Sequence, residues 1–153
     1  MTRFLLAVVG LALGLAVSVF AQQNDTVGLP MRQEVEAIDA QLDDAINNND
    51  PAIVASFFTE DAVLMLPVAF ASERSGIFSG REAIKGWFTE KFTEYHLTES
   101  KGTLNEIDGI DNGIWAVGKW THTVNTHPIV AYRAIYFIPI ERTYKIRKMF
   151  VEF

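Results

Sequence analysis

The sequence predicts an α+β domain in which helices cover one face of a largely antiparallel sheet. Apolar residues recur every three or four positions in the first half of the chain, as they do in amphipathic helices. From Thr93 onward the chain is typical of long strands, and short turn sequences such as Asn112-Gly113 separate these strands. Strands that are segregated after helices in this way indicate an α+β architecture.

The first 21 residues have the pattern of a secretory signal peptide. Arg3 supplies the positive charge, residues 4–20 are apolar or small, and Val19-Phe20-Ala21 places small side chains where a signal peptidase cleaves. The alternative is a membrane anchor, because this run approaches the roughly 18 to 20 residues that span a bilayer. We prefer cleavage because no basic cluster follows the run. The sequence therefore predicts a secreted or periplasmic protein, with no stable membrane association after cleavage.

Two helices are expected to open the domain. Residues 22–29 are a short polar tether, and the domain is expected over residues 30–153. From Pro30 the apolar residues predict an amphipathic helix that ends near Asn47. Asp50 followed by proline is typical of a helix start, and it predicts a second, short helix.

A strand and a third helix are expected next. Residues 62–67 form an apolar run that is too short for a helix and favours a buried strand. After a loop rich in Ser and Gly, Ser79-Gly80-Arg81-Glu82 has the form of a capping box. The apolar stripe that follows it predicts a third helix to about residue 92.

The rest of the chain is expected to form four strands. Asn112-Gly113 favours a tight hairpin between residues 104–107 and 114–124. Residues 125–128, which contain a proline, predict the next turn. Residues 129–140 and 144–153 then predict a final hairpin that reaches the end of the sequence.

Composition excludes several classes of protein. The chain has no cysteine, which excludes disulfide scaffolds and cysteine-ligated metal sites. Its 19 acidic residues exceed its 13 basic ones, which argues against a nucleic-acid partner. The three histidines do not have the spacing of a metal site, and no glycine-rich phosphate loop is present. No cofactor and no metal ion are therefore expected.

Two stretches, IDAQLDDAINNNDPAIVASFFTEDAVLMLP and SGREAIKGWFTEKF, resemble the NTF2-like superfamily in its SnoaL-like and ketosteroid-isomerase-like branch. The resemblance covers nearly all of the chain after the leader. It implies a cone-shaped fold in which three helices pack on a strongly bent, mainly antiparallel sheet and leave an apolar pocket open at one end. This superfamily includes isomerases, dehydratases, epoxide hydrolases and binding subunits, so the fold does not give the function.

The resemblance removes the best-known chemistry from this pocket. It places the isomerase oxyanion-hole tyrosine near Leu42, the general base at Leu66 and the second acid near Ala134 or Ile135, and none of these side chains can move a proton. Epoxide-hydrolase members use an Asp-Arg-Asp set. The sequence alone does not place two inward aspartates near Arg133.

Alternation along residues 114–124 puts Trp120 and His122 on one face of a strand, and the resemblance turns this face toward the pocket. His122 is the catalytic candidate. The residues expected to bind a substrate or ligand are Leu64, Leu66, Phe88, Trp120 and Tyr132. In the alternative interpretation Trp120 is part of the core and His122 is a hydrogen-bonded strand histidine, since no carboxylate partner is visible in the sequence.

The sequence is compatible with three functions. The first is an exported domain that binds a small, mainly apolar molecule. The second is a lyase, isomerase or hydrolase for a lipophilic substrate, with His122 as acid/base and Tyr132 or Arg133 polarising an oxygen. The third is a structural dimerisation module. A homodimer is expected because three helices cannot cover both faces of strands as apolar as residues 135–140.

The surroundings of His122 distinguish these functions. An inward histidine paired with a carboxylate would favour the enzyme. An inward histidine without such a partner would favour binding, and a pocket filled by side chains would favour the structural role.

Overall fold

The computed structural model describes residues 27–67, 76–95 and 97–153. These residues form three helices and six strands. In chain order they are α1 (Leu29–Asn47), α2 (Pro51–Ser56), β1 (Phe58–Met65), β2 (Ile77–Ser79), α3 (Arg81–Glu94), β3 (Leu97–Ile110), β4 (Gly113–Val124), β5 (His127–Ile140) and β6 (Thr143–Glu152). The predicted leader and most of the tether lie outside the described residues. Within these residues, no helix is long and apolar enough to cross a membrane.

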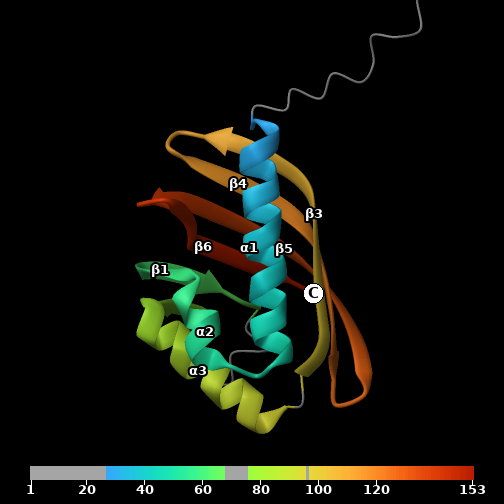
Figure 1. Ribbon diagram of the computed structural model, residues 1–153. Coiled ribbons are helices and arrows are strands. Elements are labelled where there is room, and N and C mark those ends of the chain that lie inside the picture. Colours follow the sequence, from blue (N-terminus) through green and yellow to red (C-terminus); the bar gives the residue numbers. More distant parts are fainter. Residues whose placement is uncertain (1–26, 68–75, 96) are drawn as a thin grey trace, which may run out of the picture.

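The helix α1 lies against the concave side of one curled sheet, and α2 and α3 lie together at one end of this sheet (Figure 1). The strand order is β2-β1-β6-β5-β4-β3, and all neighbours are antiparallel except β1 and β6. The predicted α+β class, with three helices on a strongly bent and mainly antiparallel sheet, is confirmed. The strand β2 was not predicted, because three residues are too few to show a period of two.

The start of α2 agrees with the sequence, whereas the start of α3 does not. Asp50 accepts hydrogen bonds from the backbone N–H groups of Ala52 and Ile53 at 3.1 and 2.9 Å. The capping box predicted for α3 is wrong, because its first residue, Ser79, still pairs with β1 as part of β2. Instead Gly80, at a φ of +90°, precedes the helix, and glycine has no side chain that could cap it.

The β3–β4 hairpin differs from the prediction in two ways. Its turn consists of Asp111 and Asn112, one residue earlier than expected, since Ile110 pairs with Gly113. The strand β3 begins at Leu97 and is much longer than residues 104–107. It carries two register shifts, and these interrupt the alternation from which a strand is recognised.

The core lies between α1 and the concave face of the sheet. Five apolar residues of α1 are buried there at helical spacing: Val35, Ile38, Leu42, Ala45 and Ile46. Each large apolar side chain that is fully buried in this way stabilises the fold by about 1.5–3 kcal/mol. Several polar side chains are buried in the same layer, and they form the candidate site.

Candidate functional site

An apolar cavity of about 230 Å³ opens between α1, α3 and β4. Most of its wall is aliphatic or aromatic, which is typical of a small-molecule site. The lining residues are Ile46, Leu66, Trp87, Phe88, Lys91, Tyr95, Leu97, Trp120, His122, Val124 and Phe153. Because the cavity is open, side chains do not fill the pocket that the resemblance implied.

Four of the predicted site residues line this cavity and two do not. Trp120 and His122 share its wall as the alternation predicted, together with Leu66 and Phe88. Leu64 is 1% exposed and lies in the core, outside the lining. The prediction for Tyr132 is wrong, because this side chain is 60% exposed. Its neighbours on β5 turn inward, so the period of two places Tyr132 on the opposite face.

His122 is a buried titratable group in the cavity wall. Its ring packs against Trp120 at 4.7 Å between centroids and against the edge of Phe153 at 6.1 Å. Burial lowers the pKa of His122 more than the negative charge of Asp43 raises it, so the imidazole is neutral at pH 7. Its Nδ1 atom is buried and has no hydrogen-bond partner within the described residues. The carboxylate partner that would favour an enzyme is therefore not found there.

Lys91 supplies the cation of the cavity lining, which the sequence analysis did not find. The residue is only 6% exposed. Its Nζ atom donates to Glu94 at 2.6 Å and to Glu90 at 3.3 Å, and it lies 5.5 Å from the centre of the Tyr95 ring. The hydrogen bond to Glu94 raises the pKa of Lys91 more than burial lowers it. The spacing of three residues between Lys91 and Glu94 is the signal that could have predicted this pair.

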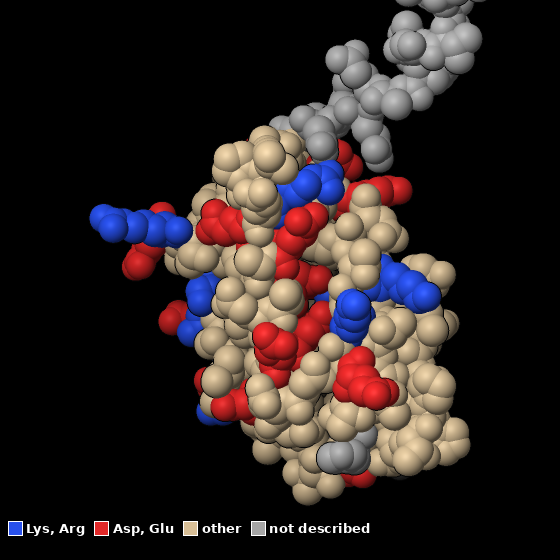
Figure 2. Space-filling model, turned by 45° about the vertical axis from the view of Figure 1, so that its right-hand side comes forward, with Lys and Arg blue, Asp and Glu red and all other residues tan. Residues whose placement is uncertain are grey.

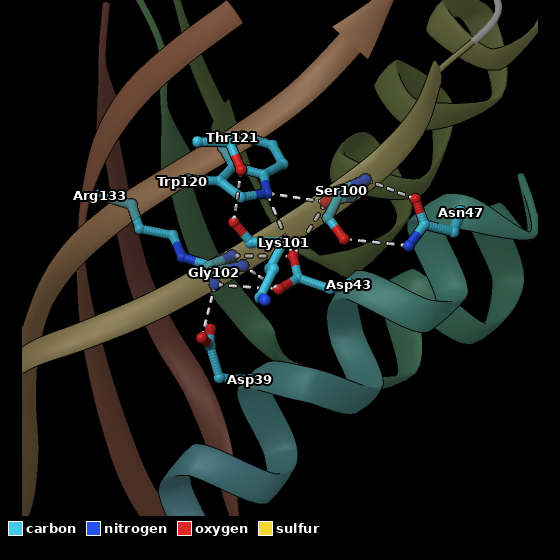
Figure 3. Close-up of polar contacts among 9 residues, drawn as sticks. All are labelled: Asp39, Asp43, Asn47, Ser100, Lys101, Gly102, Trp120, Thr121 and Arg133. Carbon is cyan, nitrogen blue, oxygen red and sulfur yellow. Dashed lines mark hydrogen bonds and ion pairs between the residues drawn. The ribbon is translucent and has the colours of Figure 1, made fainter. Parts of the chain in front are cut away.

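Asp39, Asp43 and Arg133 form a buried ionic cluster beside Trp120, a residue of the cavity wall (Figure 3). Arg133 of β5 has no exposed side-chain surface, and its Nη2 donates to Asp39 Oδ2 at 2.5 Å. Its Nη1 donates to Asp43 Oδ1 at 3.4 Å. The structure thus corrects the sequence analysis, which placed no aspartates near Arg133. Asp39 and Asp43 are four residues apart on α1, so they share one face of the helix.

Asp43 connects this ionic cluster to the cavity. It accepts hydrogen bonds from Ser100 Oγ at 2.9 Å, from the Gly102 backbone N–H at 2.5 Å and from Trp120 Nε1 at 3.1 Å. The Arg133 guanidinium also lies 5.4 Å from the centre of the Trp120 ring. A side chain at Gly102 of β3 would overlap the Arg133 guanidinium, so only glycine fits at this position. These contacts fix the orientation of the indole that forms the cavity wall.

Asp39 and Arg133 each have one buried side-chain atom without a hydrogen-bond partner among the described residues, and in Asp39 it is a carboxylate oxygen. Asp39 is 4% exposed, and its Oδ1 atom is buried without a hydrogen-bond partner in the part of the chain described here. Burial raises the pKa of Asp39 from 3.8 to about 6, although the charge of Arg133 opposes this effect. The described residues contain no group of three His, Asp or Glu side chains that could hold a metal ion.

Neither Tyr132 nor Arg133, which the enzyme hypothesis needs to polarise an oxygen, lines the apolar cavity. Tyr132 lies on the far face of the sheet, and Arg133 is outside the cavity lining and bound to two carboxylates. Asp39, Asp43 and Arg133 do lie together in this chain, but none of them lines the apolar cavity. Leu66 does line the cavity, at the position that the resemblance gives to the general base.

No protein-family model matches the sequence, and a search of curated proteins gives no significant match. Solved structures do match. Aln2 from a Streptomyces species is 15% identical, with a TM-score of 0.68 over 82% of this chain and 92% of that protein. A ketosteroid isomerase-like protein from Erwinia carotovora atroseptica is also 15% identical, with a TM-score of 0.65 over 82% of this chain and 96% of that protein.

An NTF-2 like protein of unknown function from Shewanella oneidensis is 13% identical, with a TM-score of 0.64 over 78% of this chain and 97% of that protein. At such identities the similarity shows the fold alone. The chain thus has the NTF2-like fold that the two sequence stretches indicated.

Proposed function

We propose that this protein binds a small, mainly apolar molecule in the apolar cavity. The observation that supports this most directly is the open apolar cavity with His122 in its wall. The Nδ1 atom of this histidine is buried and has no hydrogen-bond partner among the described residues. An apolar cavity of about 150 Å³ holds benzene. The 230 Å³ found here therefore suits a molecule of one or two rings.

The proposed ligand also carries one polar group. A buried polar atom that lacks its hydrogen bond costs about 1–3 kcal/mol, so a ligand that pairs with His122 recovers this free energy. The imidazole is neutral, because burial lowers its pKa, and a neutral ring nitrogen either donates or accepts. A hydroxyl group, which does both, is the simplest partner.

The test uses 1-naphthol and naphthalene, which have the same rings and differ by one hydroxyl group. Both are expected to quench the tryptophan fluorescence of the protein saturably, because Trp87 and Trp120 line the cavity. 1-Naphthol is expected to bind about tenfold more tightly than naphthalene, and His122→Phe should remove this difference.

Tyr132→Phe is the matched control, because Tyr132 lies outside the cavity. It should leave both affinities unchanged. Saturable binding of neither molecule, at concentrations up to their solubility, would refute the proposal. Native mass spectrometry of the purified protein then identifies any molecule that the cavity retains.

We also propose that the protein is a homodimer that associates through the convex face of the sheet. Trp115, Tyr136 and Phe150 form a ring cluster there, with centroids 6.3 and 5.9 Å from Trp115. Tyr132 is 60% exposed and Val130 is 47% exposed on the same strand as Tyr136. Exposed apolar surface of this kind is typical of an interface between protein chains.

Sedimentation at micromolar concentration is expected to show a dimer of the wild-type protein. Tyr132→Glu places a charge on the convex face and is expected to give a monomer, whereas Thr89→Glu on α3 should leave the dimer intact. A monomeric wild-type protein would contradict the proposed association.

Export is proposed on the pattern of the leader alone, which lies outside the described residues. The intact mass of the exported protein should correspond to a chain that begins at Gln22. A membrane-bound protein that retains residues 1–21 would support the anchor instead.

A further inference from the structure

A second hollow, separate from the apolar cavity, lies between α1 and β3. This groove has a volume of about 480 Å³. Its lining residues are Glu36, Asp39, Ala40, Asp43, Asp44, Ser100, Lys101, Gly102, Thr103 and Leu104. None of them lines the apolar cavity. We call this hollow the acidic groove, because four carboxylates and one ammonium group line it.

Figure 2 shows the acidic side chains gathered in a band over α1 and in the hollow beside it, with basic side chains at the flank. Carboxylates on one side of a groove make its potential negative, so the groove attracts cations and repels anions. This charge alone does not define a site, since a row of acidic residues is also an ordinary solvated helix face.

Asp39 gives the groove a specific unpaired acceptor. The other inward carboxylate, Asp43, accepts bonds from Ser100, Gly102, Trp120 and Arg133. Asp39 has one bond, to Arg133 through Oδ2, and its Oδ1 is buried without a donor among the described residues. Leaving such an atom unpaired is unfavourable, and the cost is larger for a charged group. Asp39 lines the groove, so a donor that reaches it enters from there.

The chemistry of the lining selects among cations. A metal ion does not fit, because the described residues offer no group of three carboxylate or imidazole ligands. A primary ammonium group needs only hydrogen-bond acceptors, and it carries three N–H donors. Ala40 and Leu104 line the same groove and offer apolar surface to a short alkyl chain. We propose that the acidic groove is a binding site for a small aliphatic amine, with its ammonium group on Asp39.

The test is a titration of the uniformly ¹⁵N-labelled wild-type protein with putrescine at constant ionic strength, followed by amide chemical shifts. Saturable shifts are expected in α1 and in residues 100–104. Asp39→Asn keeps the shape of the side chain but removes its charge, and it should weaken putrescine binding at least tenfold. Asp44 is an exposed residue of the same groove, so Asp44→Asn removes a groove carboxylate and leaves the buried ionic cluster unchanged. This variant should weaken putrescine binding severalfold.

Glu82→Gln on α3 is the matched control, because it removes an exposed carboxylate outside the groove. It should leave the affinity unchanged. If 1,4-butanediol, which has the length of putrescine but no charge, produced the same shifts, the ammonium would not be what is recognised and the proposal would fail. It would also fail if no saturable shift occurred with putrescine, or if Glu82→Gln weakened binding as much as Asp39→Asn and Asp44→Asn.

Discussion

Replacing Arg133 with methionine is expected to lower the free energy of unfolding by about 3–5 kcal/mol at pH 7. Arg133 has no exposed side-chain surface, and its guanidinium bonds to both Asp39 and Asp43. Methionine fills much of the same volume but has no charge, so two carboxylates would be left buried beside each other. Breaking a buried ion pair in this way costs more than the pair itself contributes, because the remaining charge loses both its partner and its water.

Urea unfolding followed by tryptophan fluorescence measures this effect. Arg142→Met, at an exposed turn position, is the matched control and should change the free energy of unfolding by no more than about 0.5 kcal/mol. Adding Asp39→Asn to Arg133→Met should restore part of the loss, since only one carboxylate then lacks its partner. A loss below about 1 kcal/mol for Arg133→Met, the size expected of an exposed ion pair, would contradict the burial of this ionic cluster.

The helices and most strands could be predicted from sequence because their patterns are local. The spacing of apolar residues gave α1, and the Asp50-Pro51 pair gave the start of α2. The parallel pairing of β1 with β6 could not be predicted, because these strands are far apart in sequence and share no turn. The register shifts in β3 hid its length for a different reason, since a bulge breaks the period of two.

In the candidate site, too, the local features could be predicted and the long-range contacts could not. Trp120 and His122 were placed correctly on one face because they are two residues apart on one strand. Tyr132 was placed on the wrong face because a shift of one residue reverses the direction of every side chain on a strand. The ionic cluster joins residues 94 positions apart, which no local pattern reports.

One signal of the ionic cluster was nevertheless present. Asp39 and Asp43 each follow directly after a buried apolar residue of α1, Ile38 and Leu42, so both border the apolar stripe of the helix. A carboxylate is seldom buried unless it is paired. Two carboxylates beside a buried stripe therefore indicate a cation on the facing sheet. Arg133 is the only Lys or Arg on β5, and this strand has no Asp or Glu, so Arg133 was a candidate for that cation.

Replacing Asp39 with asparagine is expected to change how stability depends on pH. The pKa of Asp39 is raised from 3.8 to about 6 in the folded protein, mainly by burial. Between these two pH values the folded state binds more protons than the unfolded state, so the free energy of unfolding falls as the pH rises. For a rise of this size the total fall is about 3 kcal/mol, and it is complete above pH 6.

Asparagine carries no charge at any pH, so its side chain at this position would not contribute this fall. The free energy of unfolding of Asp39→Asn, relative to that of the wild-type protein, is therefore expected to rise by about 2–3 kcal/mol between pH 4 and pH 7. Urea unfolding of both proteins at several pH values measures the difference between their free energies of unfolding. The titration of every group that the substitution leaves unchanged cancels in this difference. Asp44→Asn, at an exposed position of the same helix, is the control for the loss of one negative charge from α1. If the difference between Asp39→Asn and wild type stayed constant across this range, or reversed its sign, Arg133 would dominate the titration of Asp39, and the pKa of this carboxylate would not be raised by burial.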